Sequence, residues 1–249
     1  TYTYSRSGEL LSATDPEDRS TAFEWDEHGH LKAVTNPAGD RRVYRRDLLG
    51  NITGVTDFAG AATVYTYDEK SRLLKAISPT GLAQRFEWDP EDNLLLHTDA
   101  AGRKTRFEYT GVNELARRIN PDGTTVQYHY NTEEQLIAVT NERGQTYRFA
   151  YDAVGHVSAR TDYWGHTHRY IHDPAGQLIK SIDPLEQAIA FTYDPAGRLT
   201  AKQFESEEQE TFTWDPAGNL IAFESPDARV ERLFDPDGRM ILETSSGFE

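Results

Sequence analysis

The chain of 249 residues contains no cysteine, a single methionine and no run of about 18 apolar residues. Without cysteine, disulfides and thiolate metal sites are excluded, and folding does not depend on the redox compartment. The lack of a long apolar run predicts that no segment spans a membrane. Positive charge is also scarce, because 41 acidic residues against 26 Lys and Arg give a formal net charge of −15. This charge repels phosphate backbones and argues against nucleic acid as a partner.

No basic-then-apolar leader opens the chain, which begins at Thr1 inside a repeated pattern. We therefore expect a fragment of a longer protein, cut at both ends, with any targeting segment outside it. The absence of cysteine is compatible with synthesis in a reducing cytosol and later export.

Aromatic residues are plentiful, and they recur with a period of 21 residues. In one column only Arg46 and His172 are not aromatic, and the other members are Tyr4, Trp25, Tyr67, Trp88, Tyr109, Tyr130, Tyr151, Tyr193 and Trp214. A second column without exceptions lies two residues earlier and runs from Tyr2 and Phe23 to Phe212. A fixed period in this range indicates stacked supersecondary units and not a globule with one centre.

Turn residues follow each aromatic pair. An Asp accepts hydrogen bonds from backbone N–H groups ahead of it, a Pro fixes φ, and a Gly three residues after the Asp supplies positive φ, as in Asp173-Pro174-Ala175-Gly176. Glu134 occupies this Gly position and does not fit the pattern. The repeat is defined most clearly by Tyr67, Asp68, Trp88, Asp89, Tyr193, Asp194, Gly197, Leu199, Trp214, Asp215, Gly218 and Leu220.

A second short run starts at an apolar column and ends at Thr-Asp or Thr-Asn before another turn. Two runs and two turns in each period of 21 residues predict a β-hairpin repeat. We predict an all-β fold: one array over residues 1–249, with about 12 hairpins in a continuous antiparallel sheet coiled into a spiral strip or partial shell. Leu31 and Val34 have opposite parity on an unbroken strand, which leaves a bulge or a two-sided core open. The least regular structure is expected at residues 204–210, where the turn Gly and Pro are missing.

The motif Tyr193-Asp194-Pro195-Ala196-Gly197-Arg198-Leu199 and its copy at residues 214–220 resemble the YD repeats of the Rhs family. The resemblance covers essentially the whole chain. It implies a β-strip that spirals into a hollow shell, as in bacterial Rhs effectors of type VI secretion, Tc toxin complexes and teneurin ectodomains. In the bacterial members the shell encloses a C-terminal toxin until delivery. The chain has no spike adaptor, toxin domain or plug, so it is expected to form part of a wall.

Three groups of residues are candidates for a catalytic or metal-binding site. Asp215-Pro216-Ala217-Gly218 and Asp235-Pro236-Asp237-Gly238 resemble the self-cleaving segment of Rhs shells, but Arg239 replaces the expected Leu, and turn chemistry explains both. His166, His168 and His172 fall on one strand face, yet an extended strand holds His168 and His172 about 13 Å apart. Carboxylate pairs such as Asp89 and Glu91 lack the defined cleft of a glycosidase. No catalytic, cofactor or metal residue is therefore predicted.

The resulting hypothesis is a non-enzymatic shell segment, made in the bacterial cytoplasm and delivered outside the cell. Its expected partners are the enclosed toxin and the flanking repeats of the parent chain. The alternative is an extracellular recognition module that binds glycan or protein through the repeat surface, with exposed Trp164 as a test position. Unpaired strand edges at both ends also predict edge-to-edge self-association of the isolated fragment.

Overall fold

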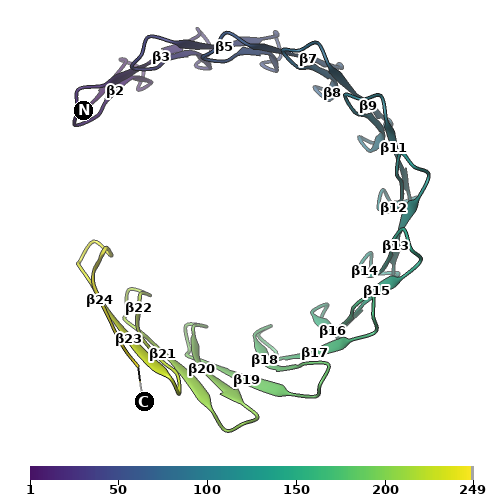
Figure 1. Ribbon diagram of the computed structural model, residues 1–249, viewed down its shortest axis with the longest axis vertical. Coiled ribbons are helices and arrows are strands. Elements are labelled where there is room, and N and C mark those ends of the chain that lie inside the picture. Colours follow the sequence, from purple (N-terminus) through teal and green to yellow (C-terminus); the bar gives the residue numbers. More distant parts are fainter. Residues whose placement is uncertain (248–249) are drawn as a thin grey trace. The chain divides into compact units, whose positions relative to one another are not determined.

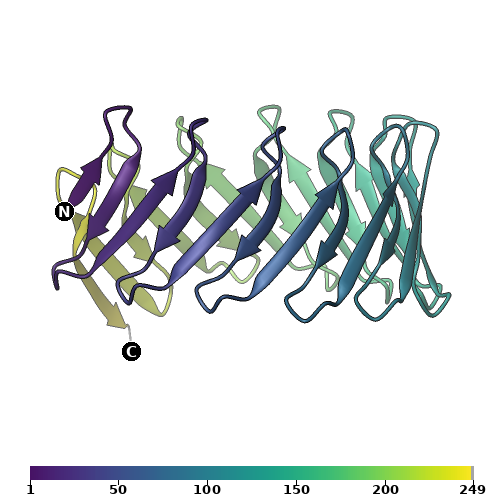
Figure 2. The same cartoon turned by 90° about the horizontal axis from the view of Figure 1, so that it is seen from above.

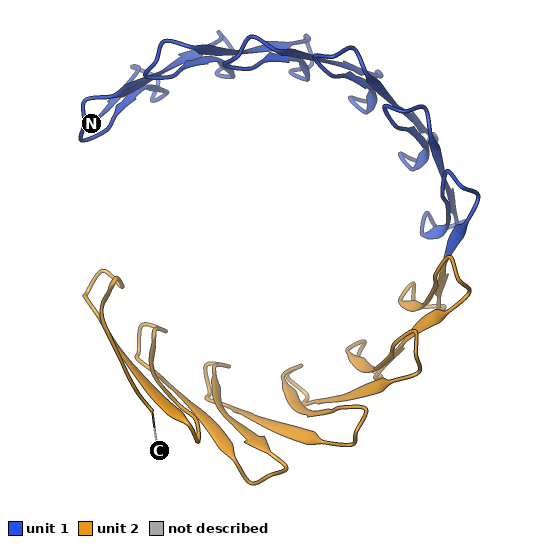
Figure 3. Cartoon of the chain, in the orientation of Figure 1, with its two compact units in different colours: residues 1–126 blue, residues 127–249 orange. Residues whose placement is uncertain are grey.

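The computed structural model describes residues 1–247, and all of its regular elements are β-strands (Figure 1). The chain divides into two compact units, residues 1–126 and 127–249 (Figure 3). The all-β fold class predicted from the sequence is confirmed.

The first unit contains twelve complete strands. They are β1 (Tyr2–Tyr4), β2 (Leu10–Thr14), β3 (Ser20–Trp25), β4 (Leu31–Thr35), β5 (Arg41–Arg46), β6 (Ile52–Thr56), β7 (Ala62–Tyr67), β8 (Leu73–Ile77), β9 (Ala83–Trp88), β10 (Leu94–Thr98), β11 (Lys104–Tyr109) and β12 (Leu115–Ile119).

Strand β13 (Thr125–Tyr130) crosses the boundary between the units, and the second unit continues with eleven more strands. They are β14 (Leu136–Thr140), β15 (Thr146–Tyr151), β16 (Val157–Thr161), β17 (Thr167–His172), β18 (Leu178–Ile182), β19 (Ala188–Tyr193), β20 (Leu199–Phe204), β21 (Gln209–Trp214), β22 (Leu220–Glu224), β23 (Ala228–Phe234) and β24 (Met240–Gly247).

Within each unit every strand pairs antiparallel with the next strand in sequence. The first unit runs from β1 to β12 in this way, and the second continues from β13 to β24. In each unit the hairpin turns lie along two opposite edges of the sheet (Figure 2). In both units the sheet bends along the direction of its hydrogen bonds, as expected for a wide twisted sheet (Figure 1).

A β-bulge in each repeat explains the parity of the apolar columns. In the β3–β4 pair, Trp25 lies opposite Leu31 and Phe23 lies opposite Val34, with a register shift that leaves Lys32 unpaired. Because cross-strand partners share a face, the extra residue places Leu31 and Val34 beside the two rings. The bulge resolves the alternative that the sequence left open.

Backbone geometry follows the repeat even where the sequence departs from it. Positive φ occurs at the turn glycines and also at Glu134 (61°), Glu186 (66°) and Glu207 (68°), each of which stands in a glycine column. Glu134 therefore adopts the turn that its side chain disfavours, because the flanking strands fix the register. The expectation of irregular structure at residues 204–210 was wrong: β20 ends at Phe204, and the turn has the same backbone hydrogen bonds as its neighbours.

The last repeat is one residue short, since Phe234, Asp235 and Gly238 each stand one position early, and the missing residue is lost from a turn. Ser225 donates its N–H to the Ala228 carbonyl, and this connection is one residue shorter than the other turns. The two strands that follow it, β23 and β24, are longer than the strands before them.

Burial is shallow throughout the described chain. Among residues 1–247, Ala33 is 0% and Val126 6% exposed, and no large side chain is fully buried. The stability of the sheet therefore depends on contacts between neighbouring strands, and a central core contributes little.

Candidate functional site

The Asp that follows the first strand of each repeat organises the next turn with its carboxylate. Asp68 Oδ1 accepts hydrogen bonds of 2.9 Å from the N–H groups of Lys70 and Arg72. Asp194 receives the equivalent pair of bonds. These contacts hold the pKa of both carboxyl groups below the ordinary value, and the backbone donor four residues ahead is the largest cause. The ionised carboxylate is thus the form that closes the turn.

Asp89 and Asp215 close their turns with an asparagine at the same position. Asn93 N–H donates to Asp89 Oδ1 and Asn219 N–H donates to Asp215 Oδ1, both at 2.8 Å. The pKa of Asp215 is lowered, first by the side-chain amide of Asn219 and then by its N–H group. An uncharged amide at this position therefore also donates to the turn carboxylate.

An arginine four residues after the Asp also connects one repeat to the next. Arg198 Nε donates to Asp194 Oδ2 at 2.7 Å, and its Nη1 donates to the Asp215 carbonyl at 2.7 Å. The guanidinium carbon lies 6.0 Å from the centre of the Trp214 ring. Arg72 makes the same set of contacts six repeats earlier. This arginine links the turns of adjacent repeats along one edge of the sheet.

The ring that precedes the Asp makes a second connection between repeats. Trp88 Nε1 donates to the Leu73 carbonyl at 2.8 Å, and Tyr193 Oη donates to the Leu178 carbonyl at 2.9 Å. In every such pair the acceptor is the bulge-flanking leucine or isoleucine of the preceding repeat. The same bond is made by Trp25, Tyr67, Tyr109, Tyr151 and Trp214.

The remaining residues of the predicted motif belong to the same structure. Gly197 and Gly218 have φ of 81° and 92° in their turns. The Leu199 carbonyl accepts the hydrogen bond from Trp214 at 2.7 Å. Leu220 lies opposite Trp214 across the β21–β22 pair. The motif residues therefore shape the turns, pair the strands of a hairpin and connect adjacent repeats, and they do not converge on a cleft.

The structure separates the histidines that the sequence places on one strand face. His166 lies before β17, where its Nδ1 is 3.0 Å from Asp162 Oδ2, whereas His172 ends β17. His172 instead meets residues from the preceding repeat. Its ring centre is 4.9 Å from that of His156, and its Nδ1 is 3.9 Å from Asp152 Oδ2.

Sequence reasoning missed this group of Asp152, His156 and His172. The three residues offer ligand atoms that all lie within 4.8 Å of one another. The signal was present in the sequence, because His156 stands at the position of Arg198 in its repeat and His172 stands at the position of the next ring. The three residues belong to two adjacent repeats, whereas the pattern on a single strand shows only His168 and His172.

The second Asp-Pro-x-Gly motif near the C-terminus forms an ordinary turn. Asp235 Oδ1 accepts hydrogen bonds from the N–H groups of Asp237 and Arg239, at 3.0 and 2.8 Å. Gly238 N–H donates to the Asp235 carbonyl at 2.9 Å. The geometry agrees with that of the upstream turns.

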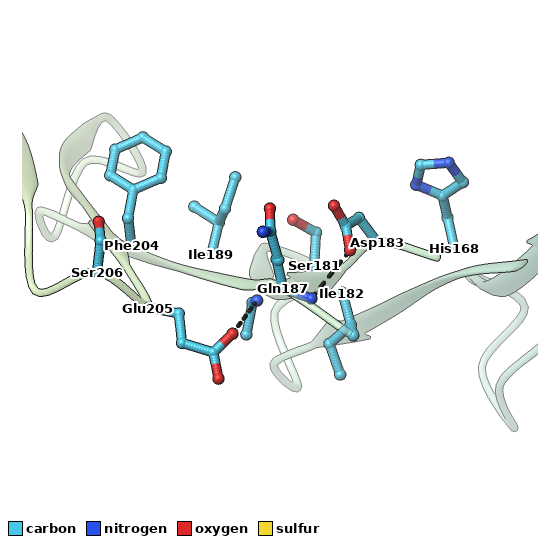
Figure 4. A pocket seen from close by; sticks show the side chains of 10 residues that line it. His168, Ser181, Ile182, Asp183, Gln187, Ile189, Phe204, Glu205 and Ser206 are labelled. Carbon is cyan, nitrogen blue, oxygen red and sulfur yellow. Dashed lines mark hydrogen bonds between the residues drawn. The ribbon is translucent and has the colours of Figure 1, made fainter. Parts of the chain in front are cut away.

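A shallow groove of about 590 Å³ lies over β17 to β20 in the second unit (Figure 4). His168, Ile189 and Phe204 point to one side of the sheet there, and Ile182 and Glu205 point to the other. Phe204 stands where most repeats have the turn Asp or Asn, so a ring replaces the usual carboxylate. The groove walls carry no cluster of convergent titratable groups.

Models of two repeat families match this chain of consecutive hairpins. The RHS repeat model matches residues 4–41 and 172–203. The teneurin YD-shell model matches residues 42–177, which is more than half of the chain. The chain belongs to the teneurin YD-shell family. The resemblance to YD repeats seen in the sequence is confirmed.

Solved structures share the YD-shell fold of this chain. A chain in the crystal structure of TcdB2-TccC3-TEV matches it with a TM-score of 0.80 and 17% identity, over 98% of this chain and 15% of that one. The structure of TcdB2-TccC3 matches with a TM-score of 0.78 and 17% identity, over 99% and 15% of the two chains. The chain thus spans about one-seventh of these neighbours. At this identity the likeness concerns the fold.

No match was found among curated proteins. Within residues 1–247, the structure has no helix of the length and apolar character needed to cross a membrane.

Proposed function

We propose that this YD-shell chain is a wall segment of a bacterial Rhs-type polymorphic toxin, in which it helps to enclose a C-terminal toxin for delivery outside the cell. The observation that carries the proposal is the use of the motif residues. Tyr67 and Trp88 donate to carbonyls of the preceding repeat, and Asp68 and Asp89 accept backbone N–H groups of their own turns. Side chains so employed are not available for chemistry on a substrate.

The fold likeness to TcdB2-TccC3 supports the same function, since that chain is more than six times longer and the present chain corresponds to part of it. We propose that both units belong to one array of hairpins and that flanking repeats of the parent continue it. The enclosed toxin and those flanking repeats would be the partners. The role is structural, and neither cofactor nor catalytic residue enters the proposal.

The test is made on the complete parent protein. Electron cryomicroscopy should place residues 1–247 in the wall of a closed chamber, and a protease should digest the downstream domain far more slowly than the same domain expressed alone. Equal digestion rates, together with an open strip in the images, would overturn the proposal.

One observation favours recognition as a second function. Trp164 lies in the turn before β17 with 75% of its surface exposed, beside Tyr163. Exposed rings of this kind stack on sugars and pack at protein interfaces. Saturable binding on a glycan array that is lost in Trp164→Ala would support recognition, and an unchanged array signal would exclude Trp164 as its basis.

A further inference from the structure

Two departures from the aromatic column follow the same change in the preceding repeat. In the turn that follows the aromatic column, a histidine stands four residues after the Asp in two places, His30 and His156. The two residues that interrupt the aromatic column, Arg46 and His172, each lie sixteen positions after one of these histidines. In this repeat pair the usual residues are therefore replaced at both positions, by His156 and His172. Such paired replacement is expected of two positions whose side chains are in contact.

His172 lacks the connection that its column normally makes. Rings in this column donate to a carbonyl of the preceding repeat, as Tyr151 does to Leu136. The Nδ1 atom of His172 is buried without a hydrogen-bond partner in the described structure, and its side chain is 15% exposed. A buried polar atom left in this state costs free energy unless a ligand satisfies it.

Two further possible metal ligands lie close to the unsatisfied nitrogen. Asp152 Oδ2 lies 3.9 Å from His172 Nδ1 and 3.3 Å from His156 Nδ1. A Cβ atom on Gly176 would lie 2.9 Å from His156 Nε2, so the glycine turn of the next repeat holds the imidazole with Nδ1 toward the carboxylate. Ligands around a tetrahedral zinc ion lie about 3.3 Å apart, given bonds of about 2.0–2.1 Å. Small side-chain shifts bring all three atoms to that spacing.

We propose that Asp152, His156 and His172 form a binding site for Zn²⁺ that joins two adjacent repeats. Two imidazole nitrogens and one carboxylate oxygen are a donor set that suits this ion, with water in the fourth position. The ion takes the place of the ring-to-carbonyl hydrogen bond found in other repeats. Exposed fractions of 31% for Asp152 and 36% for His156 leave a path for the ion to enter.

The first unit supplies a natural comparison. Asp26, His30 and Arg46 occupy the equivalent positions, and His30 Nδ1 lies 3.4 Å from Asp26 Oδ2. Arg46 has no lone pair to offer, carries a positive charge, and donates from Nη1 to the Gly50 carbonyl at 3.1 Å. This copy should not bind Zn²⁺, so an Asp–His pair alone is insufficient.

Isothermal titration calorimetry of the tag-free chain with Zn²⁺ near neutral pH tests the site. We expect saturable binding of one ion per chain, removed by EDTA. His172→Tyr restores the usual ring and His156→Gln introduces the residue found at positions 135 and 177, so both variants should fold. Each should weaken binding by about tenfold or more, because one of three ligands is lost.

His30→Gln and His166→Gln are the matched controls, since each removes an imidazole that pairs with a turn Asp elsewhere. Both should bind Zn²⁺ like the parent chain. Replacement by Co²⁺ should give visible absorption bands of a tetrahedral ion, and these bands should disappear in His172→Tyr. Absence of saturable binding, or equal affinity in folded His172→Tyr, would overturn the proposal.

Discussion

Glu134 adopts a left-handed backbone conformation that glycine supplies at the same position of most repeats. Its φ is 61°, against 94° for Gly155 one repeat later. Within residues 1–247 the Glu134 side chain makes no hydrogen bond or ion pair that substitution would remove. Glu134→Gly should therefore stabilise the protein by relieving backbone strain alone.

The size of the gain follows from two opposing costs. A non-glycine residue in this conformation costs about 1–2 kcal/mol, and glycine loses about 0.5–1 kcal/mol more backbone entropy on folding. The difference predicts a net stabilisation of about 0.5–1 kcal/mol. For a chain of this size the melting temperature should rise by roughly 1–4 °C, measured by circular dichroism.

The neighbouring residue provides the control. Glu133 lies in the same turn without positive φ, and Glu133→Gly should lower the melting temperature because it adds only the entropy cost. Gly144 has a φ of 76° and open space around its would-be Cβ atom, so Gly144→Ala should destabilise by about 1 kcal/mol through strain alone. A lower melting temperature for Glu134→Gly, equal to that of Glu133→Gly, would refute the reasoning.

Three further predictions concern contacts between repeats. Tyr151→Phe removes a 2.7 Å hydrogen bond and should cost about 1–2 kcal/mol in urea unfolding, whereas Tyr128→Phe should change stability by less than about 0.5 kcal/mol; equal effects would contradict the role of the bond. Because folded-state pKa values of Asp68 and Asp194 lie below the ordinary value, their stabilisation is complete above about pH 4 and is lost as the pH falls through the folded-state values. Asn at both positions keeps the Oδ1 acceptor and should flatten this acid loss in a pH series of thermal melts; an unchanged pH profile would show that other groups control it. The chain should self-associate with increasing concentration in sedimentation runs, and Ile241→Lys on β24, at a side chain 64% exposed, should reduce this; a monomer at every concentration would argue against pairing at the strand edges.

Much of the fold could be predicted because the same strand and turn pattern recurs in each repeat of the sequence. Alternating rings, an Asp and a positive-φ residue each have a direct backbone meaning, so the hairpins follow from any one clear copy. The prediction of irregular structure at residues 204–210 was wrong because it used only the residues of that one repeat, which lack the turn Gly and Pro. The flanking strands impose the turn on Phe204 to Glu207 whatever the side chains prefer.

The contacts between repeats were beyond the reach of strand patterns. Trp88 donates to the carbonyl of Leu73, which stands beside the bulge of the β7–β8 pair. The opposite parity of Leu31 and Val34 showed that a bulge was possible, but it did not show which backbone groups would bond to the rings. The group of Asp152, His156 and His172 was missed for a related reason, since its members are neighbours only across two repeats.

Each ring of the aromatic column bonds to the carbonyl fifteen positions before it, so whole repeats are the units that can be inserted or deleted without changing these bonds. Excision of residues 68–88 would join Tyr67 to Asp89 and recreate the Tyr-Asp junction found elsewhere, with like surfaces meeting again. A deletion within a strand that is not a multiple of the 21-residue period would set rings against the wrong carbonyls. Length in such proteins can therefore grow or shrink by duplication and loss of whole hairpins, while smaller indels are tolerated only at turn tips, as between Ser225 and Ala228.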